Sequence, residues 1–413
     1  MGIIEENGII TYKLHIDFEH GNPLDELLQD DDIEEIMYNG PDQPIKIMHS
    51  KHHMISTNLY FNSQQANKFI IDVASFNHKF LSDKAPVMDG VLPDNSRINI
   101  TIPPATRTIT FTIRRFKSKI VTIIDMINQG IIDNNTAAFL WTVVEGLGHL
   151  ATNMLVVGGT ASGKTTFLNA LSVLIPQNER IITIEDTAEL RIIQQNKVPM
   201  FSGKNSDMDS LLKNALRMRP DRIMVGEVRG AEARTLFSAM NTGHNGCMGT
   251  LHARNARETV TRITNSPMNV PMNMVRDLDL VVVLEKINET GNEKRVISEI
   301  TEIEVLAGDQ PSFNQIYKYD AKLKITTTTK IPSRLRSKIA KASGIEIKQF
   351  DKIIEDRSNI LSIIANKQKE SNNGLSTALL FDLFEKNRNH WQKYKGKKKF
   401  IFSKVKEEEL IDW

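Results

Sequence analysis

The stretch GGTASGKTT at residues 158–166 constrains this chain more than any other part of its sequence. It follows the apolar run MLVV and precedes a helical pattern, which is the context in which G-x-x-x-x-G-K-T forms a phosphate-binding loop. Glycines let the backbone curl so that N–H groups point at phosphate oxygens, and the following helix adds the positive end of its dipole. The residues expected to contact a nucleotide are Gly158, Gly159, Thr160, Ala161, Ser162, Gly163, Lys164, Thr165 and Thr166.

Two side chains of this loop have expected roles of their own. Lys164 is placed to reach the β- and γ-phosphates, and the Thr165 hydroxyl is placed to ligate Mg²⁺. Hydrolysis does not follow from the loop alone, because a loop of this kind can also bind phosphate without turnover.

The remaining apolar runs predict an α/β fold around this loop. Short runs of strand length recur along the chain, and helical patterns separate several of them; one such pattern ends at Pro220. Apolar strands that alternate with helices indicate a mainly parallel sheet covered on both faces. The runs lie at 154–157, 181–184, 222–225, 248–251 and 280–284.

Patterns on either side of the sheet divide the rest of the chain. Alternating segments at 33–61, a helical pattern at 63–80 and two strands within 97–116 predict a small α+β N-terminal domain. A helical pattern broken at Gly344 fills 333–368. We therefore expect four parts: an N-terminal domain at 1–117, a helical connector at 118–149, an ATPase-like α/β domain at 150–305 and a partly helical C-terminal extension at 306–413.

Composition limits the classes of partner. The net charge of +2 among 413 residues gives no support for a polyanionic partner, and the one cysteine, Cys247, excludes an intramolecular disulfide. The sequence has no apolar stretch of the roughly 20 residues that span a bilayer and no signal peptide at its start. A cytoplasmic protein is expected. The basic segment KYKGKKK at 393–399 is interpreted as a solvated tail, with contact to anionic lipid or nucleic acid as the alternative.

Two acidic side chains are candidates for the chemistry. The strand that faces a phosphate loop normally ends in an aspartate that helps to hold Mg²⁺, but the run at 222–225 is followed by Gly226 and then Glu227. Glu185 ends the run at 181–184, at the edge where ligands bind in parallel sheets. Our hypothesis is that Glu227 supports Mg²⁺ with Thr165 while Glu185 positions or deprotonates the attacking water, although the two roles could be exchanged. Gly226 is expected to leave room near the phosphates.

Histidine and arginine side chains add further candidates. His244 and His252 flank the run at 248–251, and both are candidates for a functional role, against the ordinary role of a packing histidine. The pair does not make a zinc site. Arg114 and Arg115 end the last predicted strand of the N-terminal domain, where guanidinium groups could neutralise γ-phosphate charge, although most surface arginines do nothing of the kind.

The ordered motifs GGTASGKTT, TIEDTAEL, DRIMVGEVRG and TGHNGCMGTLHA resemble the Walker A, Asp, Walker B and His boxes of the type II/type IV secretion and pilus motor ATPases. The segments at 33–52, 85–104 and 109–116 resemble the N-terminal domain of that family, in wording closest to its archaeal archaellum and type IV pilus branch. One departure is Ala161, where the family usually has glycine.

The resemblance implies a RecA-like ATPase domain and a homohexameric ring that uses ATP and Mg²⁺. It implies that Glu185 activates water, that Glu227 is the Walker B carboxylate, and that His252 and His244 sense the γ-phosphate. Arg114 and Arg115 would be the arginines near the nucleotide.

The implied function is a motor at the cytoplasmic membrane. It would power assembly, rotation or secretion of a filament through a polytopic membrane platform protein, and so act indirectly on pilin-like subunits. No nucleic acid is expected as a partner. The alternatives are a nucleic-acid translocase on the same core and a nucleotide-sensing scaffold.

Overall fold

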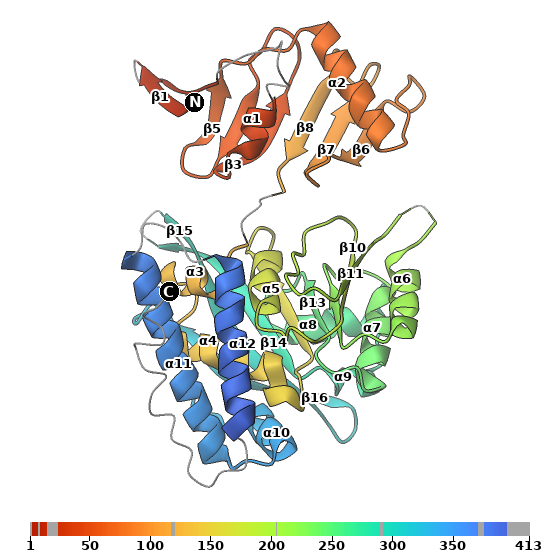
Figure 1. The fold of residues 1–413 in the computed structure, drawn as a ribbon. Coiled ribbons are helices and arrows are strands. Elements are labelled where there is room, and N and C mark those ends of the chain that lie inside the picture. Colours follow the sequence, from red (N-terminus) through yellow and green to blue (C-terminus); the bar gives the residue numbers. More distant parts are fainter. Residues whose placement is uncertain are drawn as a thin grey trace. The chain divides into compact units, whose positions relative to one another are not determined.

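The computed structural model describes residues 2–6, 9–14, 24–116, 120–203, 205–289, 292–370 and 376–394. The chain forms two compact units, residues 1–119 and residues 120–413 (Figure 1), and each is described by itself. Among the described residues, none of the helices combines the length and the apolar character needed to cross a bilayer.

Unit 1 is a mostly antiparallel sheet with two helices packed on its buried face. The described strands lie in the order β1-β2-β5-β4-β3-β8-β7-β6, and only β2 and β5 pair in parallel. Burial alternates along β7 and β8, as expected for a sheet with one covered face. The elements are β1 (Gly2–Glu6), β2 (Ile9–Lys13), α1 (Leu24–Gln29), β3 (Ile33–Tyr38), β4 (Lys46–His49), β5 (His53–Thr57), α2 (Ser63–Phe76), β6 (Val87–Val91), β7 (Arg97–Thr101) and β8 (Thr110–Arg114).

Unit 2 is built on a sheet in the order β11-β10-β12-β13-β9-β14-β15-β16-β17. The strands from β11 to β14 run parallel, and the last three are joined antiparallel. This arrangement confirms the predicted α/β class. The strands are β9 (Met154–Gly158), β10 (Ile181–Glu185), β11 (Lys197–Phe201), β12 (Arg222–Val225), β13 (Met248–Leu251), β14 (Leu280–Glu289), β15 (Asn292–Leu306), β16 (Gln310–Asp320) and β17 (Ile325–Thr328).

Helices cover both faces of this sheet, so that unit 2 has two hydrophobic cores. In β9, Met154 and Val156 face the core that contains α3, α4, α5 and the C-terminal helices, while Leu155 and Val157 face the core of α6–α9. The helices are α3 (Ile123–Asn128), α4 (Asn134–Glu145), α5 (Lys164–Ser172), α6 (Met208–Ala215), α7 (Glu232–Asn241), α8 (Ala256–Thr264), α9 (Met272–Val275), α10 (Arg334–Ser343), α11 (Ile347–Glu370) and α12 (Thr377–Tyr394), with 3-10 turns η1 (Gly146–Gly148) and η2 (Leu216–Met218).

All five predicted apolar runs are strands of this sheet, and the predicted break at Gly344 separates α10 from α11. The division of the chain differs from the expected one. The expected connector forms α3 and α4 in the core of unit 2, and the expected boundary at residue 305 falls inside β15. The physical reason is that α10–α12 have no core of their own and bury their apolar side against α3–α5. The basic segment at 393–399 begins at the end of α12, and its residues beyond Tyr394 lie outside the described part of the chain.

A buried cluster of charges ties the C-terminal helices to α4. Glu145 at the end of α4 is fully buried and accepts a hydrogen bond of 2.7 Å from Nη2 of Arg357 on α11. Arg388 on α12 places its Nε 3.5 Å from Oε1 of the same carboxylate, and Arg357 also stacks over the ring of Trp141. One buried carboxylate therefore contacts two buried arginines, of which Arg388 also pairs with Glu385.

Replacing that carboxylate is predicted to be costly. Glu145→Gln should lower the free energy of unfolding by roughly 3–5 kcal/mol, because it leaves the buried guanidinium of Arg357 without its counter-charge, although Arg388 keeps its pair with Glu385. Urea unfolding of the full chain, followed by circular dichroism, measures the loss. Lys286→Ala is the control, because Lys286 pairs with Glu293 in an exposed salt bridge of the same unit, worth about 0–1 kcal/mol. Equal stability of the two variants would contradict the role of Glu145.

Candidate phosphate-binding and catalytic site

The loop between β9 and α5 has the backbone shape of an anion cradle. A Cβ on Gly158 would lie 2.4 Å from the carbonyl oxygen of Leu284, so glycine is required there. Gly163 takes a φ of 92° and is the N-cap of α5 without any side-chain cap, which leaves helix N–H donors open to an anion. Ala161 adopts a φ of 57°, a left-handed conformation that costs roughly 1–2 kcal/mol outside glycine. The Ser162 hydroxyl is buried and has no partner in the described chain.

Lys164, His252 and Glu227 form a continuous polar chain at the carboxyl edge of the sheet. The Lys164 ammonium is nearly buried, donates to the carbonyl of Gly159 at 2.9 Å, and lies 3.4 Å from Nε2 of His252. His252 follows β13, the direct neighbour of β9, and its Nε2 lies 3.1 Å from Oε1 of Glu227. Three residues singled out from the sequence are thus brought together.

Arg229 completes this network, and the sequence had given it no role. Its Nη2 donates to Oε2 of Glu227 at 2.5 Å, and its Nη1 lies 3.6 Å from Asp186 at the end of β10. Burial opposes ionisation of Glu227, but the hydrogen bond from Arg229 and the charges of Arg229, His252 and Lys164 outweigh it and lower the carboxyl pKa. The sequence spacing could have indicated this contact, because the guanidinium of an arginine two residues after Glu227 can reach the Glu227 carboxylate.

The cations of the network are also perturbed. Burial lowers the pKa of Lys164, although the charge of Glu227 partly restores it. Burial, followed by repulsion from Lys164, lowers the pKa of His252 as well, so that its imidazole is neutral at pH 7. In the Nε2–H tautomer the ring donates to Glu227 and orients that carboxylate.

Glu185 occupies a different environment, one strand further out. It ends β10, which is separated from β9 by β12 and β13, so two strands lie between it and the strand that leads into the loop. Its side chain is 2% exposed, and Oε1 accepts from the backbone N–H groups of Glu189 at 2.9 Å and Leu190 at 2.7 Å. Burial raises the pKa of Glu185 to about 7, even though the two N–H donors lower it. Oε2 has no partner in the described chain.

Gly226 makes room for Glu185. A Cβ at Gly226 would lie 3.1 Å from Cγ of Glu185 and 3.5 Å from its Oε1. The space that this glycine leaves after β12 therefore admits the neighbouring carboxylate rather than phosphate directly.

The structure does not bring His244 to this edge. His244 precedes β13 and His252 follows it, and β13 runs parallel to β9 with Met248 opposite Met154. Because the phosphate loop lies after β9, His244 belongs to the amino edge of the sheet, on the far side from Lys164. Of the two histidines, only His252 lies at the same edge as Lys164 within one chain.

Arg114 and Arg115 lie in unit 1, and the structure separates their environments. The Arg115 guanidinium donates to the carbonyls of Leu28, Asp30 and Ile33, which anchors it around α1. Arg114 is exposed at the end of β8. The described contacts therefore make Arg115 a structural residue of its own unit and leave Arg114 the more accessible of the two.

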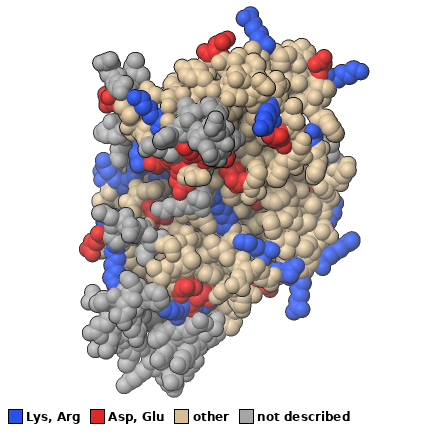
Figure 2. All heavy atoms as spheres, turned by 45° about the horizontal axis from the view of Figure 1, so that its top comes forward, with Lys and Arg blue, Asp and Glu red and all other residues tan. Residues whose placement is uncertain are grey.

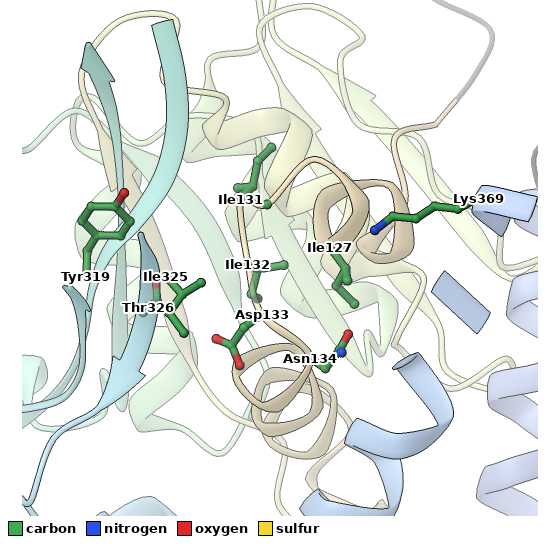
Figure 3. A pocket seen from close by; sticks show the side chains of 10 residues that line it. Ile127, Ile131, Ile132, Asp133, Asn134, Tyr319, Ile325, Thr326 and Lys369 are labelled. Carbon is green, nitrogen blue, oxygen red and sulfur yellow. The ribbon is translucent and has the colours of Figure 1, made fainter. Parts of the chain in front are cut away.

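A separate pocket of about 260 Å³ lies beside the turn between α3 and α4 (Figure 3). Four of its ten lining residues are isoleucines, and Lys369 reaches in from α11. The carboxylate of Asp133 in this wall already caps α4 through the N–H groups of Asn135 and Thr136. The pocket shares no residue with the phosphate loop, and we assign it no function.

Comparisons with known proteins show the family of the chain. A family model described as type II/IV secretion system protein matches residues 19–378. An uncharacterized protein of Methanocaldococcus jannaschii is 46% identical over 231 residues, covering 54% of this chain and 32% of that protein. A second uncharacterized protein of that organism is 31% identical, covering 83% of this chain and 63% of its own length. This chain therefore spans less than two thirds of either protein.

A better-covered relative comes from a bacterium. The type IV secretion system protein VirB11 of Bartonella henselae is 33% identical over 280 residues, which cover 59% of this chain and 78% of that protein. The family model covers most of the present sequence, including the phosphate loop and every strand of the parallel sheet. The chain belongs to the type II/IV secretion system protein family.

Proposed function

We propose that this chain hydrolyses ATP to ADP and phosphate with Mg²⁺ and uses the energy as a motor of a secretion or pilus machine. One observation carries the proposal: an uncapped phosphate loop and two carboxylates with opposite pKa shifts meet at the carboxyl edge of one sheet. Titratable groups whose environments separate their pKa values are the usual mark of divided acid–base roles.

The residues divide the work according to these environments. The helix N-terminus and Lys164 bind the phosphates, and neutral His252 contacts both Lys164 and Glu227 and so couples the loop to the acidic strand end. Glu185, with a pKa about 7 and one free oxygen, accepts a proton from the attacking water. We assign that base role to Glu185 rather than Glu227, because the network holds Glu227 ionised.

The side chains present fit a magnesium ion. The Thr165 hydroxyl at the start of α5 and the ionised Glu227 carboxylate supply the oxygen ligands that Mg²⁺ prefers, directly or through water. An ion held there would supply positive charge against the negative charge that develops on the phosphates. Arg229 holds Oε2 of Glu227 in the structure and must yield that oxygen if the carboxylate binds the ion directly.

The finer assignments are part of the same proposal. The archaeal wording of the motifs and the similarity to an archaeal protein support an archaellum or type IV pilus motor that works as a homohexamer. Its expected partner is a polytopic membrane platform protein, through which it acts on pilin-like subunits. Arg114 is our candidate for an arginine that approaches the nucleotide from an N-terminal domain.

The competing proposal is a nucleic-acid translocase built on the same ATPase core. On the face drawn in Figure 2, most Lys and Arg side chains stand apart and are interspersed with Asp and Glu. Together with the net charge of +2, this speaks against a polyanion as the main partner. Hydrolysis that single-stranded nucleic acid stimulates strongly would favour the translocase instead.

Lys164 gives the primary test. Lys164→Ala should abolish ATP hydrolysis and weaken nucleotide binding at least tenfold, because a nearly buried ammonium on the phosphates is lost. Phosphate release and titration with a fluorescent ADP measure the two effects. Lys213→Ala is the control, since that exposed lysine pairs with Asp209 on α6, away from the loop. Unchanged turnover in Lys164→Ala would refute the proposal.

Glu185 gives a test by pH. If it is the base, kcat/KM of the wild-type chain should rise with pH and level off above about 7, where the carboxylate becomes ionised. Glu185→Gln should lower kcat by at least two orders of magnitude and lose this limb, while its affinity for Mg²⁺ and ADP stays close to that of the wild type. If Glu185→Gln keeps its turnover and loses only Mg²⁺ affinity, the roles of Glu185 and Glu227 must be exchanged.

The free energy of unfolding of the wild-type chain should fall with rising pH, in the opposite sense to kcat/KM. Between its ordinary pKa of 4.5 and about 7, folded Glu185 keeps a proton that the unfolded chain releases, so stability falls as pH rises. The free energy of unfolding of Glu185→Gln should therefore rise relative to that of the wild type from pH 5 to pH 7, by roughly 3 kcal/mol at most. Above pH 7 the difference between the two should level off. Urea midpoints at three pH values measure it, and a constant difference would contradict the raised pKa.

A further inference from the structure

A β-bulge in β15 lies at the level of the phosphate loop. In the pairing of β14 with β15, Val283 lies opposite Glu299 but Leu284 lies opposite Ile297, so Ser298 is the extra residue. On the other flank of β14, Leu284 pairs with Gly158, the first glycine of the loop. Bulges next to active sites commonly re-aim a side chain.

The bulge changes which side chains of β15 face α5. Ile300 faces the core that contains α5, and with regular alternation Ser298 and Val296 would follow it on that face. The extra residue shifts the alternation by one, and Ile297 is found in the same core as Ile300. Arg295, two residues before Ile297, is thereby turned to the side of the phosphate loop.

Arg295 lies directly on this loop. Its Nε donates to the carbonyl of Ala161 at 3.3 Å, and a Cβ on Gly163 would lie 3.3 Å from its Cδ. Its two terminal nitrogens donate to no atom of the described chain. The guanidinium of Arg295 therefore offers N–H donors beside the loop that leads to Lys164. Its strand, β15, contains none of the four family motifs.

We propose that Arg295 is a ligand of the nucleotide's phosphates, supplied by the same chain. A guanidinium presents parallel N–H donors that match phosphate oxygens, and it keeps its charge when water is excluded. This inference rests on the proposed nucleotide site and adds to it a residue that binds phosphate independently of the N-terminal unit.

Binding without turnover tests the proposal. Pyrophosphate and ADP are titrated against a fluorescent ADP on the 413-residue chain without Mg²⁺. Arg295→Ala should weaken both about ten- to hundredfold, the range for a lost charge-assisted hydrogen bond. Arg295→Lys should recover part of the loss. Lys294→Ala removes the same charge one residue away, where the ammonium lies beside Gly130, and should change binding by no more than about twofold. Equal affinities of Arg295→Ala and Lys294→Ala would overturn the proposal.

A second variant separates phosphate binding from mere support of the loop. If Arg295 only braces the left-handed Ala161, glycine at that position removes the need for it, and Ala161→Gly/Arg295→Ala should bind as well as Ala161→Gly alone. That result would also overturn the proposal, whereas a loss that persists in the double variant supports it. A chain that binds nucleotide but does not hydrolyse it contradicts the proposed function and leaves this test intact.

Discussion

The close packing of the phosphate loop against β14 is the constraint on which the rest of the site depends. The carbonyl of Leu284 approaches Gly158 so closely that no side chain fits, and this contact sets where β9 ends and the loop begins. From there the backbone enters α5 through Gly163 and leaves the helix N-terminus uncapped. Strand order then decides which side chains meet the loop, because each strand delivers its last residue to the same edge.

The two acidic groups differ because of strand order and neighbours, not because of residue type. Glu227 follows β12 and lies among cations, and their charge holds it ionised despite partial burial. Glu185 ends β10, one strand further from the loop, where burial raises its pKa to about 7 and the two neutral N–H donors offset this only in part. One glutamate is suited to hold a metal and the other to take a proton. Gly226 allows both to coexist, because any side chain there would press on Glu185.

Much of this could be predicted from the sequence, and the failures have physical causes. Continuous apolar runs are typical of buried parallel strands, so the five runs predict five strands correctly. Polar residues interrupt the sequences of β11 and β15–β17, and no apolar run indicates these strands. The separation of His244 from the phosphate loop could have been predicted from the sequence, because residues before and after a parallel strand lie at opposite edges of the sheet. The carbonyl partners of Arg115 lie more than 80 positions away along the chain, and the bulge that turns Arg295 toward the loop has no sequence signature.

The C-terminal helices are part of the nucleotide-binding unit and not an appendage to it. Arg388 on α12 places its Nε beside Glu145 and donates through Nη2 to the carbonyl of Leu174, in the segment that follows α5. Glu385 on the same helix accepts from the backbone N–H of Gln177. Displacing α12 would therefore break hydrogen bonds to the segment behind the phosphate-loop helix and expose a buried charge pair. These contacts join α12 to the segment that follows α5, the helix whose first residue is Lys164, so the C-terminal helices and the phosphate loop share one packed unit.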